Sequence, residues 1–417
     1  MSAMGPRRLT AKFGILALAA SALLLCVTPT SRALTEALPD RLDDRTFWTL
    51  VTEFSEPNGF FRSENLVSNE MVFQHVIPRL QRTLVPASAY VGVGPDQNFT
   101  YIAALKPRIA FIVDIRRQNM LLHLMYKALI EMSPTREAFL SRLFSRPVPE
   151  NTLPNDSAYA LLTAFEKEEP DGVAFERTRA EIYARLQRQH GFSLSRADLG
   201  GIDYVYRAFY SAGPDIRYSF GRGSGWQPFP SYKDLMTADD GQGVQRGYLA
   251  SEEIYQTLRD LEERNLIVPL VGDFAGPKAL RSVARYLDLH HATVSVFYTS
   301  NVEQYLFRPQ GAFGGSDAWQ RFYDNVGALP IEPRSTFIRA FFNSQGRVTR
   351  IPNGGQPDPQ SGIAQIPPGF APMPPGFAPP TGPGPRSETL LNPISVLLEA
   401  FAEGRISIYN DVIDLSR

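Results

Sequence analysis

Cysteine and net charge are nearly absent from this sequence. One cysteine, Cys26, occurs among the 417 residues, so no intramolecular disulfide and no cysteine-based metal site can form. The formal net charge is −1 and no long basic run occurs, which argues against a nucleic-acid-binding surface. The chain is 43% hydrophobic and long enough to bury a large core.

Several catalytic signatures are missing as well. The chain has no His-Glu-x-x-His zinc motif, no Walker-type phosphate loop and no Gly-x-Ser-x-Gly nucleophile turn. Two adjacent histidines, His290 and His291, would point to opposite faces of a strand and so cannot easily share a metal ion. We therefore expect no metal site.

The first 33 residues have the pattern of a targeting segment. Basic residues within 1–12 precede an uncharged apolar run at 13–27, and small residues stand at positions 31 and 33. This pattern predicts that 1–33 is a signal peptide or an N-terminal membrane anchor. Either would place the body of the protein in the periplasm or cell envelope, and a cytoplasmic chain is the alternative.

Apolar runs alternate with helical patterns along the rest of the chain. Strands are expected at 87–93, 109–113, 266–271, 292–298 and 336–342. Helices are expected at 40–56, 62–85, 98–105, 118–146, 157–168, 174–189, 196–211, 251–264, 278–289 and 316–326. Continuous apolar strands that alternate with helices predict an α/β fold with a doubly wound, mostly parallel, Rossmann-like sheet.

The same pattern predicts the domain organisation. The Rossmann-like domain is expected in two parts, 34–149 and 251–347, with a largely helical insertion at 150–250 between strands two and three. Residues 348–386 are rich in proline and glycine, so we expect a disordered tether. Such a tether acts as a spacer or as a ligand for a protein partner. The apolar segment 387–417 is expected to dock on the body.

Glycines and an acid mark the ends of the first two expected strands. Ligands of open α/β sheets bind outside the carboxyl ends of the strands, where the strand order reverses. Gly92 and Gly94 would let a ligand approach the backbone, and Asp114 follows 20 residues after Gly94. A carboxylate at this spacing accepts hydrogen bonds from ribose hydroxyls. Gln97 replaces the third glycine of the dinucleotide fingerprint, which favours a ligand with a ribose but no pyrophosphate.

Two later strand ends extend this pattern. Asp273 and Phe274 follow the third strand and suit the amine and ring of an adenine, and a polar stretch that begins at Tyr298 ends the fourth. Structural roles are the alternatives. The two glycines could form a tight turn, Asp114 could pair with Arg116 or Arg117, and the later polar residues could cap turns or helices.

This order of motifs, over residues 87–117 and 266–305, resembles the class I S-adenosylmethionine-dependent methyltransferases. The resemblance implies a sheet of the methyltransferase type, with S-adenosylmethionine as cofactor. It departs from the family at Tyr90 and Val91, where an acid is usual. By position, the resemblance puts Gly92, Gly94 and Asp96 at the amino-acid part of the cofactor, Asp114 at the ribose, Asp273 and Phe274 at the adenine, and Tyr298 and Asn301 near the reacting centre.

Three functions are compatible with these features. The first is methyl transfer to an acceptor that the protein aligns with the sulfonium methyl while it excludes water. The second is a non-catalytic envelope binding or scaffold protein descended from the same fold, because an exported body would meet little cytosolic cofactor. The third, nicotinamide-dependent oxidoreduction, is disfavoured by Gln97. The expected partner is a small molecule in the crevice, with membrane contact only through the N-terminal segment.

Overall fold

The computed structural model describes residues 37–61, 63–83, 88–219, 229–308, 315–343 and 386–416. The predicted targeting segment 1–33 lies outside the described residues, and so does the predicted tether, except for its last residue. Within the described part of the chain, no helix combines the length and the apolar character that crossing a membrane requires.

One six-stranded mixed sheet forms the centre of the fold, with the strand order β3-β2-β1-β4-β5-β6. The strands are β1 (Ala89–Gly92), β2 (Ile109–Asp114), β3 (Ile267–Val271), β4 (Val294–Ser300), β5 (Ile331–Asn343) and β6 (Arg386–Pro393). Strands β1 to β5 are parallel, and β6 runs antiparallel to β5. The predicted α/β class with a mostly parallel, Rossmann-like sheet is confirmed. The order reverses between β1 and β4, which is where such sheets bind ligands.

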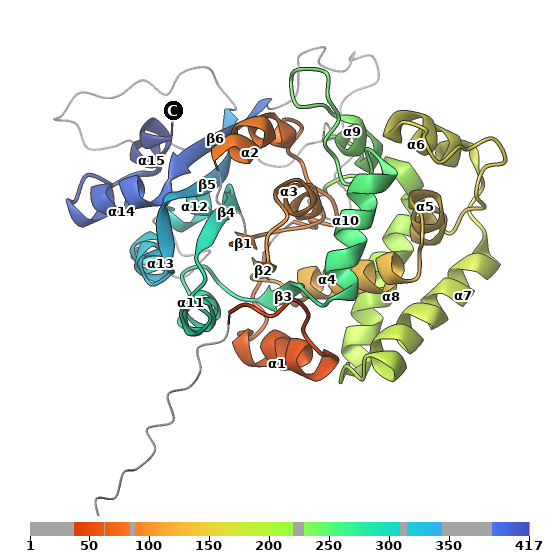
Figure 1. The fold of residues 1–417 in the computed structure, drawn as a ribbon, viewed down its shortest axis with the longest axis horizontal. Coiled ribbons are helices and arrows are strands. Elements are labelled where there is room, and N and C mark those ends of the chain that lie inside the picture. The colour runs from red at the N-terminus through yellow and green to blue at the C-terminus, as the bar shows by residue number, and fades with distance from the viewer. Residues whose placement is uncertain are drawn as a thin grey trace, which may run out of the picture. The chain divides into compact units, whose positions relative to one another are not determined.

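Helices cover both faces of this sheet (Figure 1). One face carries α1 (Asp44–Phe54), α11 (Ala279–Leu289), α13 (Ala318–Gly327) and α14 (Ile394–Ala402). The other carries α2 (Ile77–Thr83), α3 (Gln97–Leu105), α4 (Arg117–Glu131) and α10 (Glu252–Glu263). Two short helices, α12 (Val302–Leu306) and α15 (Tyr409–Leu415), complete the part of the chain after β4.

The segment between β2 and β3 is helical, as predicted. Beyond α4 it contains α5 (Arg136–Phe144), α6 (Ala158–Lys167), α7 (Gly172–Tyr183), the π-helix η2 (Ala184–Gln189), α8 (Arg196–Ala212), the 3₁₀ turn η3 (Gly213–Asp215), α9 (Tyr232–Thr237) and α10. Helix α8 packs against α4, and α10 packs against both α3 and α4. The insertion therefore lies on the face of the sheet that α3 and α4 cover.

Two predicted helices are wrong in extent. The helix expected at 62–85 is an irregular segment followed by the 3₁₀ helix η1 (Phe73–Val76) and α2. Pro78 lies in the first turn of α2, where a missing backbone N–H breaks no helical hydrogen bond. The helix expected at 118–146 is two helices, because Pro134 interrupts it and Thr135 caps α5 through the backbone N–H of Ala138.

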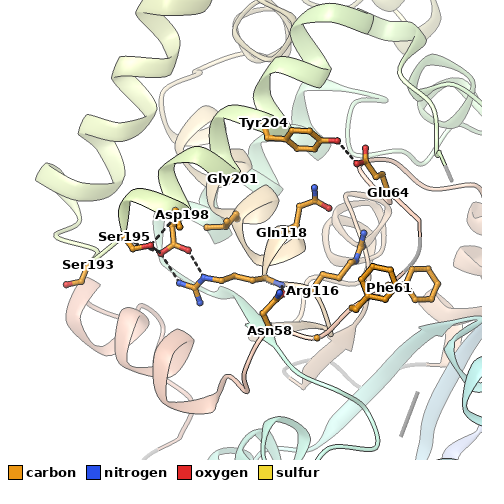
Figure 2. A pocket seen from close by; sticks show the side chains of 15 residues that line it. Asn58, Phe61, Glu64, Arg116, Gln118, Ser193, Ser195, Asp198, Gly201 and Tyr204 are labelled. Carbon is orange, nitrogen blue, oxygen red and sulfur yellow. Dashed lines mark hydrogen bonds and ion pairs between the residues drawn. The ribbon is translucent and has the colours of Figure 1, made fainter. Parts of the chain in front are cut away.

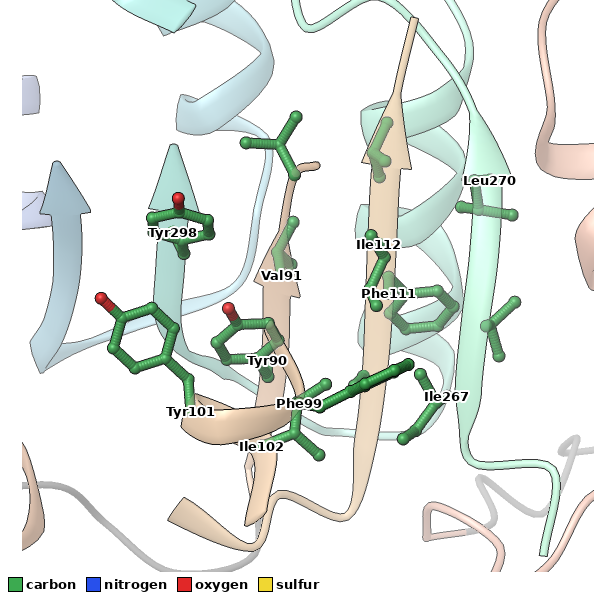
Figure 3. Close-up of a cluster of buried hydrophobic side chains, with 14 of the residues drawn as sticks. Tyr90, Val91, Phe99, Tyr101, Ile102, Phe111, Ile112, Ile267, Leu270 and Tyr298 are labelled. Atoms are coloured by element: carbon green, nitrogen blue, oxygen red, sulfur yellow. The ribbon is translucent and has the colours of Figure 1, made fainter. Parts of the chain in front are cut away.

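Continuous apolar strands build the core beneath the strand ends (Figure 3). Every residue of β1, β2 and β3 is buried, as expected for parallel strands that are covered on both faces. Aromatic side chains of α3 lie over the sheet, where Tyr101 approaches Tyr90 and Tyr298 at ring-centroid distances of 6.5 and 5.2 Å. This packing holds the carboxyl ends of the central strands in place.

Candidate functional site

A cavity lies at the carboxyl ends of β1 to β4, at the point where the strand order reverses. Its lining includes Gly94 after β1, Asp114 at the end of β2, Asp273 and Phe274 after β3, and Ser300 and Asn301 at the end of β4. Residues 65 and 67–70, which precede β1 in the chain, form another wall. The cavity volume is about 90 Å³, smaller than the roughly 300–1,000 Å³ of typical small-molecule sites.

The structure brings five of the eight predicted site residues to this cavity. They are Gly94, Asp114, Asp273, Phe274 and Asn301. The other three, Gly92, Asp96 and Tyr298, do not line it. They lie beneath or beside its floor, and each has contacts within the protein that account for its position.

Gly92 makes room for a side chain of the protein. A Cβ atom at this position would lie 2.0 Å from Oδ1 of Asn98. Asn98 accepts a hydrogen bond from the Tyr90 hydroxyl at 2.8 Å and donates from Nδ2 to the carbonyl oxygens of three loop residues, Val93, Gly94 and Pro95. Asn98 therefore sets the shape of the loop that follows β1, and alanine at position 92 would displace it.

Gly94 and Asp96 both have hydrogen-bond partners outside this loop. Gly94 has a φ of +81°, which favours glycine, and its carbonyl accepts from Nε2 of His123 at 2.9 Å. Burial lowers the pKa of His123 to about 4, so the ring is neutral at pH 7. The Asp96 carboxylate accepts from the Tyr248 hydroxyl at 2.9 Å, and burial raises its pKa to about 7. The Asp96 side chain thus contacts the helical insertion, to which Tyr248 belongs.

Asp114 forms an ion pair with Arg116, one of the structural alternatives that the sequence left open. Its Oδ1 accepts from the backbone N–H of Arg116 at 2.9 Å and from Nε at 3.3 Å, and Oδ2 accepts from Nη2 at 3.4 Å. Both side chains are buried, and Arg116 also donates to the carbonyl of Ser63 at 3.0 Å. The acid expected to bind a ribose therefore has a guanidinium partner in this conformation.

The loop after β3 is built around a second carboxylate, Glu56. Asp273 caps its own turn by accepting from the Ala275 N–H at 2.9 Å, and its pKa is raised by burial and by the nearby charge of Glu56. The Glu56 carboxylate accepts from the backbone N–H groups of Asp273, Lys278 and Ala279 at 2.8 to 3.0 Å. An acidic side chain of the protein thus fills the anion site at the start of α11.

The aromatic residue at this strand end, Phe274, is held by its neighbours in the core. Its ring stacks on Phe322 at a centroid distance of 5.5 Å and meets Phe297 edge-on at 5.1 Å. Asn301, at the end of β4, precedes α12 but makes no capping hydrogen bond with its side chain. Asn301 is one of the residues that line the cavity.

Glu70 is the residue that sequence reasoning missed. It is buried in the cavity wall, and its Oε1 accepts from the hydroxyls of Tyr298, at 2.7 Å, and Ser300. Burial raises its pKa to about 7, although both hydroxyls oppose the shift. Ser300 has a φ of +51°, an uncommon value for a non-glycine residue and one that is often found at functional sites. A single acid in an irregular segment before β1 carries no motif that would have identified it.

A wider groove adjoins the cavity and shares Phe61 and Arg116 with it (Figure 2). The groove has a volume of about 870 Å³ and is lined by residues 58–61 and by α8. Two of its lining residues, Arg117 and Asp198, form an ion pair. Burial raises the pKa of Asp198, but hydrogen bonds from Arg117 and Ser195 outweigh that effect and lower it to about 2. The groove therefore combines an ion pair with apolar side chains such as Phe60 and Leu121.

Comparison with known proteins gives a family assignment. The model of the family described as "domain of unknown function (DUF7790)" matches residues 65–198 and 222–357, which is more than half of the chain. The matched residues include Glu70 and all five predicted site residues that line the cavity. A search of curated proteins finds no match. No group of three or more His, Cys, Asp or Glu side chains among the described residues could hold a metal ion.

Proposed function

This chain belongs to the DUF7790 family, and we propose that it binds S-adenosylmethionine in the cavity and transfers the methyl group to an acceptor in the adjoining groove. One observation carries the proposal. Residues picked out at four separate strand ends, up to 207 positions apart between Gly94 and Asn301, line one cavity at the reversal of strand order.

The charge of the cavity supports this ligand over a dinucleotide. Three carboxyl groups line it, those of Glu70, Asp114 and Asp273, while Arg116 is the one basic side chain among its described lining residues. Glu56 already fills the nearby helix N-terminus. A pyrophosphate would bring negative charge to an acidic site. A sulfonium compound brings positive charge and carries no phosphate.

Five of the predicted site residues have a role in this proposal. Asp114 accepts hydrogen bonds from the ribose hydroxyls once the Arg116 guanidinium turns away from it. Phe274 and Asp273 border the adenine, and Asn301 lies beside the reacting centre. Tyr298 supports the floor by accepting from Gln97 Nε2 at 2.7 Å and donating to Glu70. The bound cofactor supplies the methyl group, and the protein aligns the acceptor and excludes water.

A non-catalytic binding protein is the second candidate. The ion pair between Asp114 and Arg116 favours it, because the pair must open before a ribose can reach the carboxylate. The small volume of the cavity points the same way. The predicted targeting segment would also place such a protein in the cell envelope, away from cytosolic cofactor. In this function the same cavity holds a small ligand without reaction.

Calorimetric titration of the full chain with S-adenosylmethionine, S-adenosylhomocysteine and NAD tests the proposal. We expect the two sulfur compounds to bind and NAD not to bind. Binding of none of the three would contradict both enzymatic functions and leave the binding protein. Recovery of the protein from the periplasmic fraction of cells would favour the binding protein, and recovery from the cytosol would favour the methyltransferase.

A further inference from the structure

Two buried oxygen atoms in the cavity wall have no hydrogen-bond partner among the described residues. They are Oε2 of Glu70 and Oε1 of Gln97. The two side chains are 1% and 3% exposed, and both line the cavity. A buried acceptor left unpaired destabilises the folded protein. Buried polar atoms in proteins usually pair with a protein group, a ligand or an ordered water.

The hydrogen bonds around these atoms fix which of them stay free. Gln97 donates from Nε2 to the Tyr298 hydroxyl, and Tyr298 donates its single proton to Oε1 of Glu70, both at 2.7 Å. Ser300 donates to the same Oε1. These bonds use the hydroxyl protons of Tyr298 and Ser300 and one N–H of the Gln97 amide. Glu70 Oε2 and Gln97 Oε1 are left as acceptors that no described side chain pairs with.

We propose that Glu70 Oε2 and Gln97 Oε1 form an acceptor pair that binds the protonated primary amine of a ligand in the cavity. An ammonium group supplies several N–H donors and a positive charge from one atom, which matches one carboxylate and one amide oxygen. An ionised carboxylate carries only acceptors and could pair with neither of these two oxygens. A hydroxyl has one proton and could pair with only one of the two oxygens.

Two sources could provide this amine, the amino-acid part of the cofactor or an amine that accepts the methyl group. The first source rests on the function proposed above, whereas the ammonium chemistry does not. In the first case Glu70 would supply the acid that is absent before Gly92, where Tyr90 and Val91 stand. In the second case Glu70 would bind the acceptor beside Ser300 and the end of β4.

The ammonium site is tested on the full chain at pH 8 with two small probes of similar size, propylammonium and propionate. We expect propylammonium to raise the melting temperature of the wild-type protein and propionate not to. Glu70→Gln should abolish the shift, because it replaces the free carboxylate oxygen by an amide. Glu53→Gln, on an exposed position of α1 away from the cavity and the groove, is the control. The shift should persist in this variant.

The source of the amine is tested by calorimetry with S-adenosylmethionine and 5′-methylthioadenosine, which lacks the amino-acid part. If the amine belongs to the cofactor, Glu70→Gln weakens the affinity for S-adenosylmethionine at least tenfold. The affinity for 5′-methylthioadenosine then stays within twofold of the wild type. If the amine belongs to the acceptor, Glu70→Gln changes neither affinity. The shift in melting temperature with propylammonium is still lost in this variant. If the wild type binds neither nucleoside, the proposed function fails and the propylammonium result still decides the ammonium site. Equal shifts with both probes, or the same propylammonium shift in Glu70→Gln, would overturn the inference.

Discussion

Glu70→Gln should make the protein more stable at pH 8 than the wild type while leaving it unchanged at pH 4.5. The carboxyl is buried, and its pKa is about 7 in the folded protein against an ordinary value of 4.5. An acid with a raised pKa favours folding when it is protonated. Its contribution is therefore complete below pH 4.5, falls as the pH rises towards 7, and is lost above that value.

The size of the effect follows from these two values. Each tenfold change in an acid constant corresponds to about 1.4 kcal/mol, so the interval from 4.5 to about 7 corresponds to about 3 kcal/mol. Glutamine keeps the acceptor for Tyr298 and Ser300 but does not ionise. The advantage of the variant in unfolding free energy should grow by about 3 kcal/mol between pH 4.5 and pH 8.

Urea unfolding of the wild type and the variant across this pH range measures the difference. Because the other buried acids are common to both proteins, their titrations cancel. Glu399→Gln, on an exposed position of α14, is the control and should show little dependence on pH. A difference that does not change with pH, or a variant that loses stability relative to the wild type as the pH rises, would refute the reasoning.

Three further predictions concern the frame of the site. His190 makes hydrogen bonds with Asp44 and Glu131 at 2.7 Å each. Burial lowers the pKa of His190, but the two acids outweigh this effect and raise it above 6.5. Protonated His190 therefore stabilises the fold at low pH, so His190→Gln should lower the unfolding free energy at pH 5.5 and have little effect at pH 9. Gly92→Ala should lower the unfolding free energy by about 1–3 kcal/mol, because Asn98 must move. Gly200→Ala, in open space on α8, should raise it by about 0.5–1 kcal/mol. Thermal unfolding measures both effects. Glu303→Gln should cost about 3–5 kcal/mol in urea unfolding, because it leaves the buried Arg339 guanidinium without its anionic partner.

The strands were the most predictable part of this fold. Continuous apolar runs such as 109–113 and 266–271 can hardly be anything other than buried strands once helices flank them. The strand expected at 336–342 is shorter than β5, which begins at Ile331. Residues 331–335 contain a proline and several polar residues, which do not predict a buried strand. Strand β6 was not distinguished within the docking segment 387–417. Its residues pair with residues of β5 that are at least 43 positions earlier, the separation of Asn343 and Arg386.

The candidate site was predictable where residues stand at strand ends and less so elsewhere. Topology brings Gly94, Asp114 and Asp273 together, because the carboxyl ends of parallel strands share one edge of the sheet. The partners of these residues depend on side-chain packing that no spacing encodes. No sequence pattern predicts the hydrogen bond between Asp96 and Tyr248. The same holds for the hydrogen bond between Glu70 and Ser300 at the end of β4.

The affinity of Asp114→Ala for S-adenosylmethionine tests the central claim most directly. Two hydrogen bonds from ribose hydroxyls to a carboxylate, at about 1.5–3 kcal/mol each, predict a loss of at least tenfold in calorimetric Kd. Asp96→Asn is the control, because that carboxylate bonds to Tyr248 and does not line the cavity, and its affinity should stay within twofold of the wild type. An unchanged Kd in Asp114→Ala would contradict the placement of the ribose at the end of β2.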